Sequence, residues 1–169
     1  MSLSMFDASV PALLQGLKGL KTMLAKAEAH AEAKKIDPAA LLQARLYPDM
    51  FPLVKQVQIA CEFARGISAR LARVDVPAHE GDETTFADLD ALLDKTLAFI
   101  GGLDAAKFAG SEDHEIVLRP GTPKERKLAG QAYLSTYGLP QFFFHVTTTY
   151  AILRHNGVAI GKKDYMGAW

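Results

Sequence analysis

Apolar residues recur at intervals of three and four positions in four separate segments of this chain. In a helix of 3.6 residues per turn this spacing lines them up on one face, which has to be buried against other elements. The pattern therefore predicts four long helices. The apolar positions of the four segments are, in order, Val10, Leu13, Leu14, Leu17, Leu20, Leu24, Ala27 and Ala31; Leu53, Val57, Ala60, Cys61, Ala64, Ile67, Ser68 and Leu71; Phe86, Leu89, Leu92, Leu93, Leu97 and Ile100; and Leu139, Phe142, Val146, Thr149 and Leu153.

Helix-breaking residues separate these segments. The first predicted helix starts at Val10, with Pro11 in its first turn, and ends before Asp37-Pro38, because the residue before a proline is pushed out of the helical region. A short turn of helix is expected over residues 38–44. Two prolines within residues 46–52 exclude a helix interior there and predict a corner.

The later boundaries carry cap residues. Thr84 or Thr85 can cap the third helix, and Gly101-Gly102 ends it. The fourth helix is expected to open at Gly138-Leu139-Pro140 and to end at Asn156-Gly157.

The stretch from Asp104 to Gly130 has no helical period. Residues 115–119 and 126–129 flank Pro120-Gly-Thr-Pro123, which predicts a small β-hairpin in the crossover between the third and fourth helices. The expected fold class is therefore all-α, a four-helix bundle with one small hairpin, in a single domain over residues 1–169. No alternating strand and helix pattern supports a parallel sheet, and no repeat period supports a solenoid.

Charge and cysteine usage narrow the function classes. The chain carries 19 basic and 19 acidic side chains, and a net charge of zero argues against a dedicated binder of nucleic acid or of an anionic membrane. One cysteine cannot form an internal disulfide, and neither a membrane-spanning run nor a signal peptide is evident. These features predict a cytoplasmic protein with no nucleic-acid partner and no membrane partner. Residues 79–114 are acidic, which is interpreted as a solvated helix face.

Motifs of common enzyme classes are missing from the sequence. It contains no glycine-rich phosphate loop, no CxxC pair and no GxSxG elbow. Phosphoryl transfer, dinucleotide chemistry and serine hydrolysis are therefore poorly supported.

Several segments carry a family resemblance: ARLYPDMFPL at 44–53, QVQIA at 56–60, ETTFADL at 83–89 and LPQFFFHVTTTYAILRHNG at 139–157. Over essentially its whole length the chain resembles a family of uncharacterised bacterial proteins placed with the DinB/YfiT-like bundles. The resemblance implies an up-down-down-up four-helix bundle, commonly found as a homodimer. Many relatives in that superfamily bind a divalent metal through one histidine on the second helix and a His-x3-His pair on the fourth, and some are thiol-dependent transferases or isomerases.

This sequence departs from that metal-binding pattern. On the fourth helix the pair reads Gln141 and His145, and on the second helix the nearest residues are Gln56 and Gln58, with no histidine between Ile36 and Pro77. A carboxamide oxygen is a weak ligand, whereas tight zinc sites use imidazole, thiolate or carboxylate. We therefore expect a degenerate metal site, with no metal and no cofactor.

The same residues predict a candidate ligand site. Gln141, His145 and Thr148 share one edge of the fourth helix, at i, i+4 and i+7, and buried polar groups on such an edge need partners. Gln56 or Gln58 on the second helix can supply them. The expected small-molecule pocket lies between the second and fourth helices, with Phe51 or Tyr150 among the aromatic neighbours. His145 can equally be a structural histidine satisfied by a glutamine, and the sequence leaves both interpretations open.

Two other residues of the second helix are interpreted as structural. Arg65 is expected to pair with Glu62 across one turn, and Cys61 is expected to be a small core residue rather than a nucleophile. No catalytic residue is assigned.

Two function classes remain open. The first is a binding or structural protein, a cytoplasmic homodimeric bundle with an inter-helix pocket for a small molecule. The second is an enzyme, a metal- or thiol-dependent transferase or isomerase that uses His145 as a ligand or general base.

Overall fold

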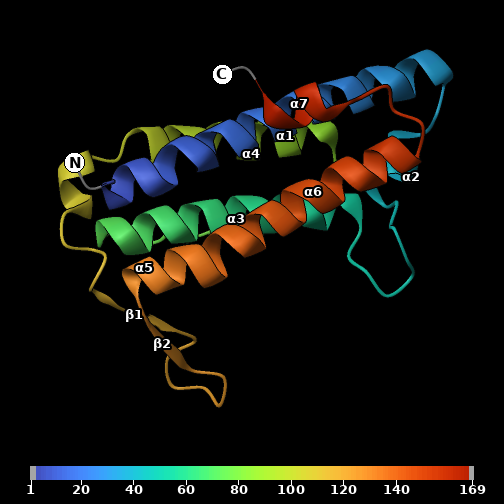
Figure 1. The fold of residues 1–169 in the computed structure, drawn as a ribbon. Coiled ribbons are helices and arrows are strands. Elements are labelled where there is room, and N and C mark those ends of the chain that lie inside the picture. Colours follow the sequence, from blue (N-terminus) through green and yellow to red (C-terminus); the bar gives the residue numbers. More distant parts are fainter. Residues whose placement is uncertain (1–2, 168–169) are drawn as a thin grey trace.

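The computed structural model describes residues 3–167, and four long helices form its frame (Figure 1). They are α1 (Met5–Lys34), α3 (Leu53–Ala72), α4 (Phe86–Gly101) and α6 (Leu139–His155). α1 runs in one direction, α3 and α4 run back, and α6 again runs with α1. The predicted all-α bundle is confirmed, with the up-down-down-up order that the resemblance implied.

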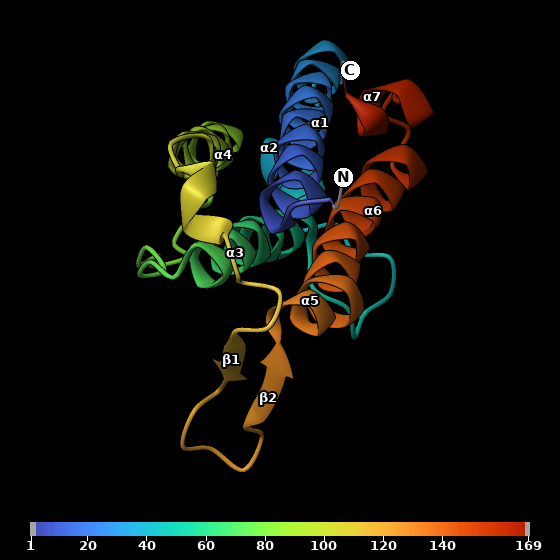
Figure 2. The ribbon, with the colours of Figure 1, turned by 60° about the vertical axis from the view of Figure 1, so that its left-hand side comes forward.

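Shorter elements connect the long helices. They are α2 (Pro38–Leu42), the 3₁₀ turn η1 (Ala105–Phe108), strands β1 (Glu115–Leu118) and β2 (Arg126–Ala129), α5 (Gly130–Ala132), the π-helical segment η2 (Tyr133–Gly138) and α7 (Lys162–Met166). The two strands pair antiparallel, from Glu115 opposite Ala129 to Leu118 opposite Arg126. This predicted hairpin projects from one end of the bundle, beside α5 (Figure 2).

The first helix starts earlier than predicted, at Met5 instead of Val10. Ser4 caps it, because its hydroxyl oxygen accepts a hydrogen bond from the Asp7 backbone N–H at 3.0 Å. Pro11 consequently lies inside the helix and not in its first turn.

The fourth long helix, α6, starts at Leu139 as predicted, but the chain before it is already helical. The chain turns helical at Gly130 and continues through η2 into α6 without a break. Pro140 lacks an N–H, and in a regular α-helix its ring would clash with the carbonyl of Thr136, four residues before it. Thr136 lies in the wider π-helical segment, which accommodates the proline within the helix.

Glycines bring two other segments close to α1. A Cβ at Gly16 would lie 2.7 Å from the Phe142 ring of α6. A Cβ at Gly19 would overlap the backbone carbonyl of Tyr165 in α7. The absence of these side chains lets α6 and α7 pack on α1, and α7 was not predicted from the sequence.

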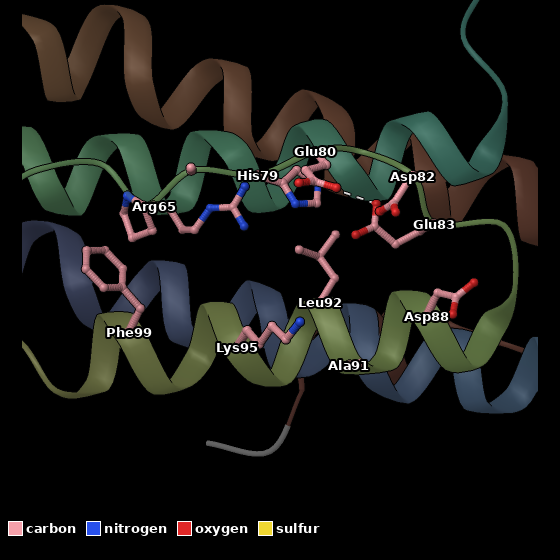
Figure 3. Close-up of a pocket in the computed structure, with 12 residues that line it drawn as sticks. Arg65, His79, Glu80, Asp82, Glu83, Asp88, Ala91, Leu92, Lys95 and Phe99 are labelled. Carbon is pink, nitrogen blue, oxygen red and sulfur yellow. Dashed lines mark ion pairs between the residues drawn. The ribbon is translucent and has the colours of Figure 1, made fainter.

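The core lies between the four long helices, and α3 is its central element. α3 packs most extensively on α6 and also contacts α4 and α1. The loop from Arg73 to Thr85 then runs back along the bundle between α3 and α4 (Figure 3). Within residues 3–167, no helix combines the length and the apolar character needed to cross a membrane.

Candidate functional site

His145 of α6 is hydrogen-bonded to Gln56 of α3. The imidazole Nδ1 lies 2.7 Å from Oε1 of Gln56, and both side chains are buried. Gln56 Nε2 donates in turn to the backbone carbonyl of Phe51 at 3.0 Å. This chain of hydrogen bonds connects the fourth helix of the bundle to the corner before the second.

The chain fixes the tautomer of His145. Because the amide nitrogen of Gln56 faces a carbonyl, the atom facing the imidazole is the amide oxygen, which can only accept. Nδ1 of His145 must therefore carry the proton and donate. Nε2 then keeps its lone pair, and it makes no hydrogen bond to any residue from 3 to 167.

Aromatic rings enclose this imidazole. Phe63 of α3 stacks on it, with ring centroids 5.9 Å apart and planes 15° apart, and Phe144 meets it edge-on at 5.2 Å. The side chain is 8% exposed, and burial lowers the pKa of His145 from 6.5 to about 4. The imidazole is therefore neutral near pH 7 and acts as a hydrogen-bond acceptor through Nε2.

Thr148 and Gln141 lie one turn from His145 in opposite directions along α6. The buried Thr148 hydroxyl donates to the Phe144 carbonyl at 2.8 Å. Thr148 lines a groove of about 390 Å³ together with Leu46 and Phe144. Gln141 lines a groove of about 540 Å³ beside the hairpin. His145 itself lines neither groove.

The other two candidate residues lie away from His145. Gln58 is on the opposite flank of α3, where its Nε2 donates to the Gly81 carbonyl at 3.1 Å and to Glu83 Oε2 at 2.9 Å. Tyr150 packs edge-on against Tyr165 of α7, with centroids 6.0 Å apart. The structure therefore brings together His145 and Gln56, with Thr148 and Gln141 adjacent along the helix.

A second hollow, of about 570 Å³, lies between α3, α4 and the Arg73–Thr85 loop (Figure 3). Its charged residues are Arg65, Lys95, Glu80, Asp82, Glu83 and Asp88, and His79 also lines it. The predicted pair between Arg65 and Glu62 does not form, and Glu62 is exposed to solvent. Arg65 forms no salt bridge with any of residues 3–167. The sequence analysis missed this hollow because it depends on a loop whose course has no periodic signal.

The donor set around His145 does not fit a divalent metal. Gln56 directs its oxygen at the Nδ1–H of His145 and its nitrogen at the Phe51 carbonyl, and a carboxamide oxygen is a weak ligand for zinc. Gln141 lies in the groove beside the hairpin, and one imidazole cannot hold zinc alone. Residues 3–167 contain no group of three or more His, Cys, Asp or Glu side chains arranged for a metal ion.

The thiol of Cys61 is equally unsuited to nucleophilic chemistry. It is fully buried, and burial raises its pKa from 9.0 to about 12. Only the thiolate is a good nucleophile, and almost none of it is present near pH 7.

Comparison with known proteins assigns the family. Residues 5–166 match the family described as a domain of unknown function, DUF1993. The chain belongs to this family. It is also similar to a DinB family member protein from Shewanella denitrificans of known crystal structure. That protein is 40% identical to this chain, the match covers 97% of this chain and 92% of that one, and the TM-score is 0.91. The resemblance to an uncharacterised DinB-like family is thereby confirmed. No curated protein matches the chain.

Proposed function

We propose that this protein binds a small organic molecule beside His145, between α3 and α6, at the position where relatives of the bundle hold a metal. One observation carries the proposal: the hydrogen bonds through Gln56 to Phe51 hold a neutral imidazole with its Nε2 lone pair unused. An acceptor that no protein group occupies, on a side chain that is only 8% exposed, favours a ligand that donates a hydrogen bond.

The surroundings indicate the shape of the ligand. Phe63 and Phe144 present aromatic faces and edges to the imidazole, which suits a flat apolar ring carrying one donor group. Gln141 and Thr148 lie one turn from His145 in opposite directions along α6 and line separate grooves.

The low pKa of His145 favours binding over catalysis. A general base works best when its pKa is near the working pH. With a pKa of about 4, His145 is a weak base near neutrality, although it remains a good hydrogen-bond acceptor. The transferase or isomerase alternative would use the same lone pair and is the less favoured reading for this reason.

The proposal includes a homodimer and a cytoplasmic location. Four large apolar side chains are exposed beside the site: Leu46 at 41%, Tyr47 at 67%, Phe51 at 55% and Phe144 at 54%. Three of the four are aromatic, and we call the set the aromatic patch. Leu46 and Phe144 line the same groove. Exposed apolar surface typically marks an interface, and we propose that a second copy of the chain covers it next to His145.

A pair of probes tests the ligand site. Phenol supplies a flat ring and a donor, whereas anisole has the same ring without a donor. Titrations followed by amide NMR shifts should show phenol perturbing residues around His145 more strongly than anisole. His145→Ala should abolish the preference, and His155→Ala, at the exposed end of the same helix, should keep it. Equal perturbation by both probes, or a phenol response unchanged in His145→Ala, would contradict the proposal.

A further inference from the structure

Arg65 is a buried cation without a counter-ion. Its side chain is 5% exposed, and its Nε is enclosed and has no hydrogen-bond partner. No carboxylate among residues 3–167 forms a salt bridge with it. Leaving a buried N–H donor without a partner is costly, and among residues 3–167 the guanidinium also has no carboxylate to pair with.

The guanidinium is directed into the hollow between α3 and α4. Figure 3 shows it pointing into that space from α3, with Lys95 and Phe99 across from it on α4. An arginine presents a planar fork of N–H donors that matches a carboxylate or phosphate with two parallel hydrogen bonds. This end of the hollow is therefore built to receive an anionic group.

The opposite end of the hollow is acidic. Asp82, Glu83 and Asp88 lie there, away from Arg65 (Figure 3). Glu83 is held by Gln58 and lies 3.4 Å from Nε2 of His79. Hydrogen bonds from the Thr84 backbone N–H and from Thr85 lower the pKa of Asp88, so its carboxylate is charged near pH 7.

The opposite charges at the two ends of the hollow favour one class of ligand. Carboxylates at one end repel a multiply charged phosphate but attract an ammonium group. A volume of about 570 Å³ is in the range of small-molecule sites. We propose that this hollow binds a small zwitterion, with its carboxylate on Arg65 and its ammonium group facing Glu83. This site is on the opposite flank of α3 from His145 and is independent of the function proposed above.

A matched set of ligands tests the charge pattern by calorimetry. The probes are 6-aminohexanoate, hexanoate, which lacks the amine, and inorganic phosphate. We expect one equivalent of 6-aminohexanoate to bind with affinity in the millimolar range or better, and more tightly than hexanoate or phosphate. Tighter binding of phosphate would overturn the zwitterion assignment, and no binding of 6-aminohexanoate would overturn the proposal.

Substitutions locate the two charges. Arg65→Met keeps an unbranched apolar stem without the guanidinium and should weaken binding by about tenfold or more, because the paired charge-assisted hydrogen bonds are lost. Arg70→Met is the matched control; Arg70 lies on the same helix, contacts Tyr133 outside the hollow, and its loss should leave binding unchanged. Glu83→Gln keeps a hydrogen-bond acceptor for Gln58. It should weaken the binding of 6-aminohexanoate but not the binding of hexanoate. Equal binding in Arg65→Met and the wild type would refute the site.

A second variant covers the case in which Arg65→Met fails to fold. Arg65→Lys keeps the charge but not the planar fork, so it should fold and bind more weakly than the wild type. The Nε–H signal of Arg65 gives a readout in the unmodified protein. It should shift on addition of 6-aminohexanoate, and a signal that does not move would contradict contact with the guanidinium.

Discussion

At the scale of single residues, His145 shows how burial determines chemistry. Its Nδ1–H is used by Gln56, and Phe63 and Phe144 pack against the ring, so burial disfavours the charged form. An exposed histidine at the same place would be a pH-sensitive cation; this one is a fixed neutral acceptor.

The pKa of His145 gives the first prediction. An NMR titration of the imidazole should have its midpoint near 4, below the usual 6.5, because burial disfavours the imidazolium. The unfolded chain binds the proton more tightly, so the contribution of His145 to stability is complete above pH 6.5 and is lost as the pH falls toward 4. Gln56→Glu should raise the midpoint, since a carboxylate beside Nδ1 stabilises the imidazolium. A wild-type midpoint near 6.5 would show that the ring is hydrated.

At the scale of elements, the capping of a helix and the close packing of two helices can be tested separately. Thr85 caps α4 through a capping box: its hydroxyl accepts from the Asp88 N–H at 3.1 Å, and the Asp88 carboxylate accepts from the Thr85 N–H at 2.9 Å. Thr85→Ala should lower the free energy of unfolding by about 1 kcal/mol. Thr84→Ala is the control, since the Thr84 hydroxyl makes only a 3.4 Å contact with Asp88. Urea unfolding measures the free energy of unfolding of both variants. An equal loss of stability in Thr85→Ala and Thr84→Ala would argue against the capping role of Thr85.

A pair of glycines tests the contact between α1 and α7. Gly101→Ala, near the end of α4 with open space around it, should stabilise the protein by up to about 1 kcal/mol through helix propensity. Gly19→Ala gains the same propensity but places a methyl group on the Tyr165 carbonyl, so it should destabilise the protein. Thermal unfolding compares the two variants. A stabilising Gly19→Ala would mean that α7 does not pack closely on α1.

Local spacing predicted the long helices well, because their buried faces repeat within each segment. Segments whose conformation depends on contacts with other parts of the chain were harder to predict. The helical course through Gly130 to Pro140 depends on a π-helical segment, and α7 is held by a glycine more than 140 residues away.

The candidate site divides in the same way. Gln141, His145 and Thr148 were aligned by helical spacing, and a glutamine from α3 does reach His145. Spacing on α3 alone could not tell whether Gln56 or Gln58 faces α6, because that depends on how the two helices are rotated against each other. The surroundings of Arg65 depend on the course of the Arg73–Thr85 loop, and the sequence of this loop has no regular spacing of apolar residues from which that course could be predicted.

At the scale of the whole molecule, the aromatic patch predicts self-association. Light scattering should give a mass of about 37 kDa, twice the 18.4 kDa of one chain. Tyr47→Asp, in the patch, should shift the protein toward the monomer, because an interface core disfavours an unpaired charge. Val76→Asp, also at an exposed apolar position but in the Arg73–Thr85 loop, should leave the mass unchanged. A wild-type mass of about 18 kDa at micromolar concentration would exclude the dimer.

The central proposal is that His145 and Gln56 form a neutral hydrogen-bonding set without a metal, at the position where the family resemblance implies a metal in other bundles. Elemental analysis of protein purified without chelator, compared with His145→Ala, tests it most directly. Because the carboxamide of Gln56 is a weak ligand and His145 is a lone imidazole, we predict zinc and nickel contents well below one equivalent in both proteins. A stoichiometric metal in the wild type that disappears in His145→Ala would contradict it.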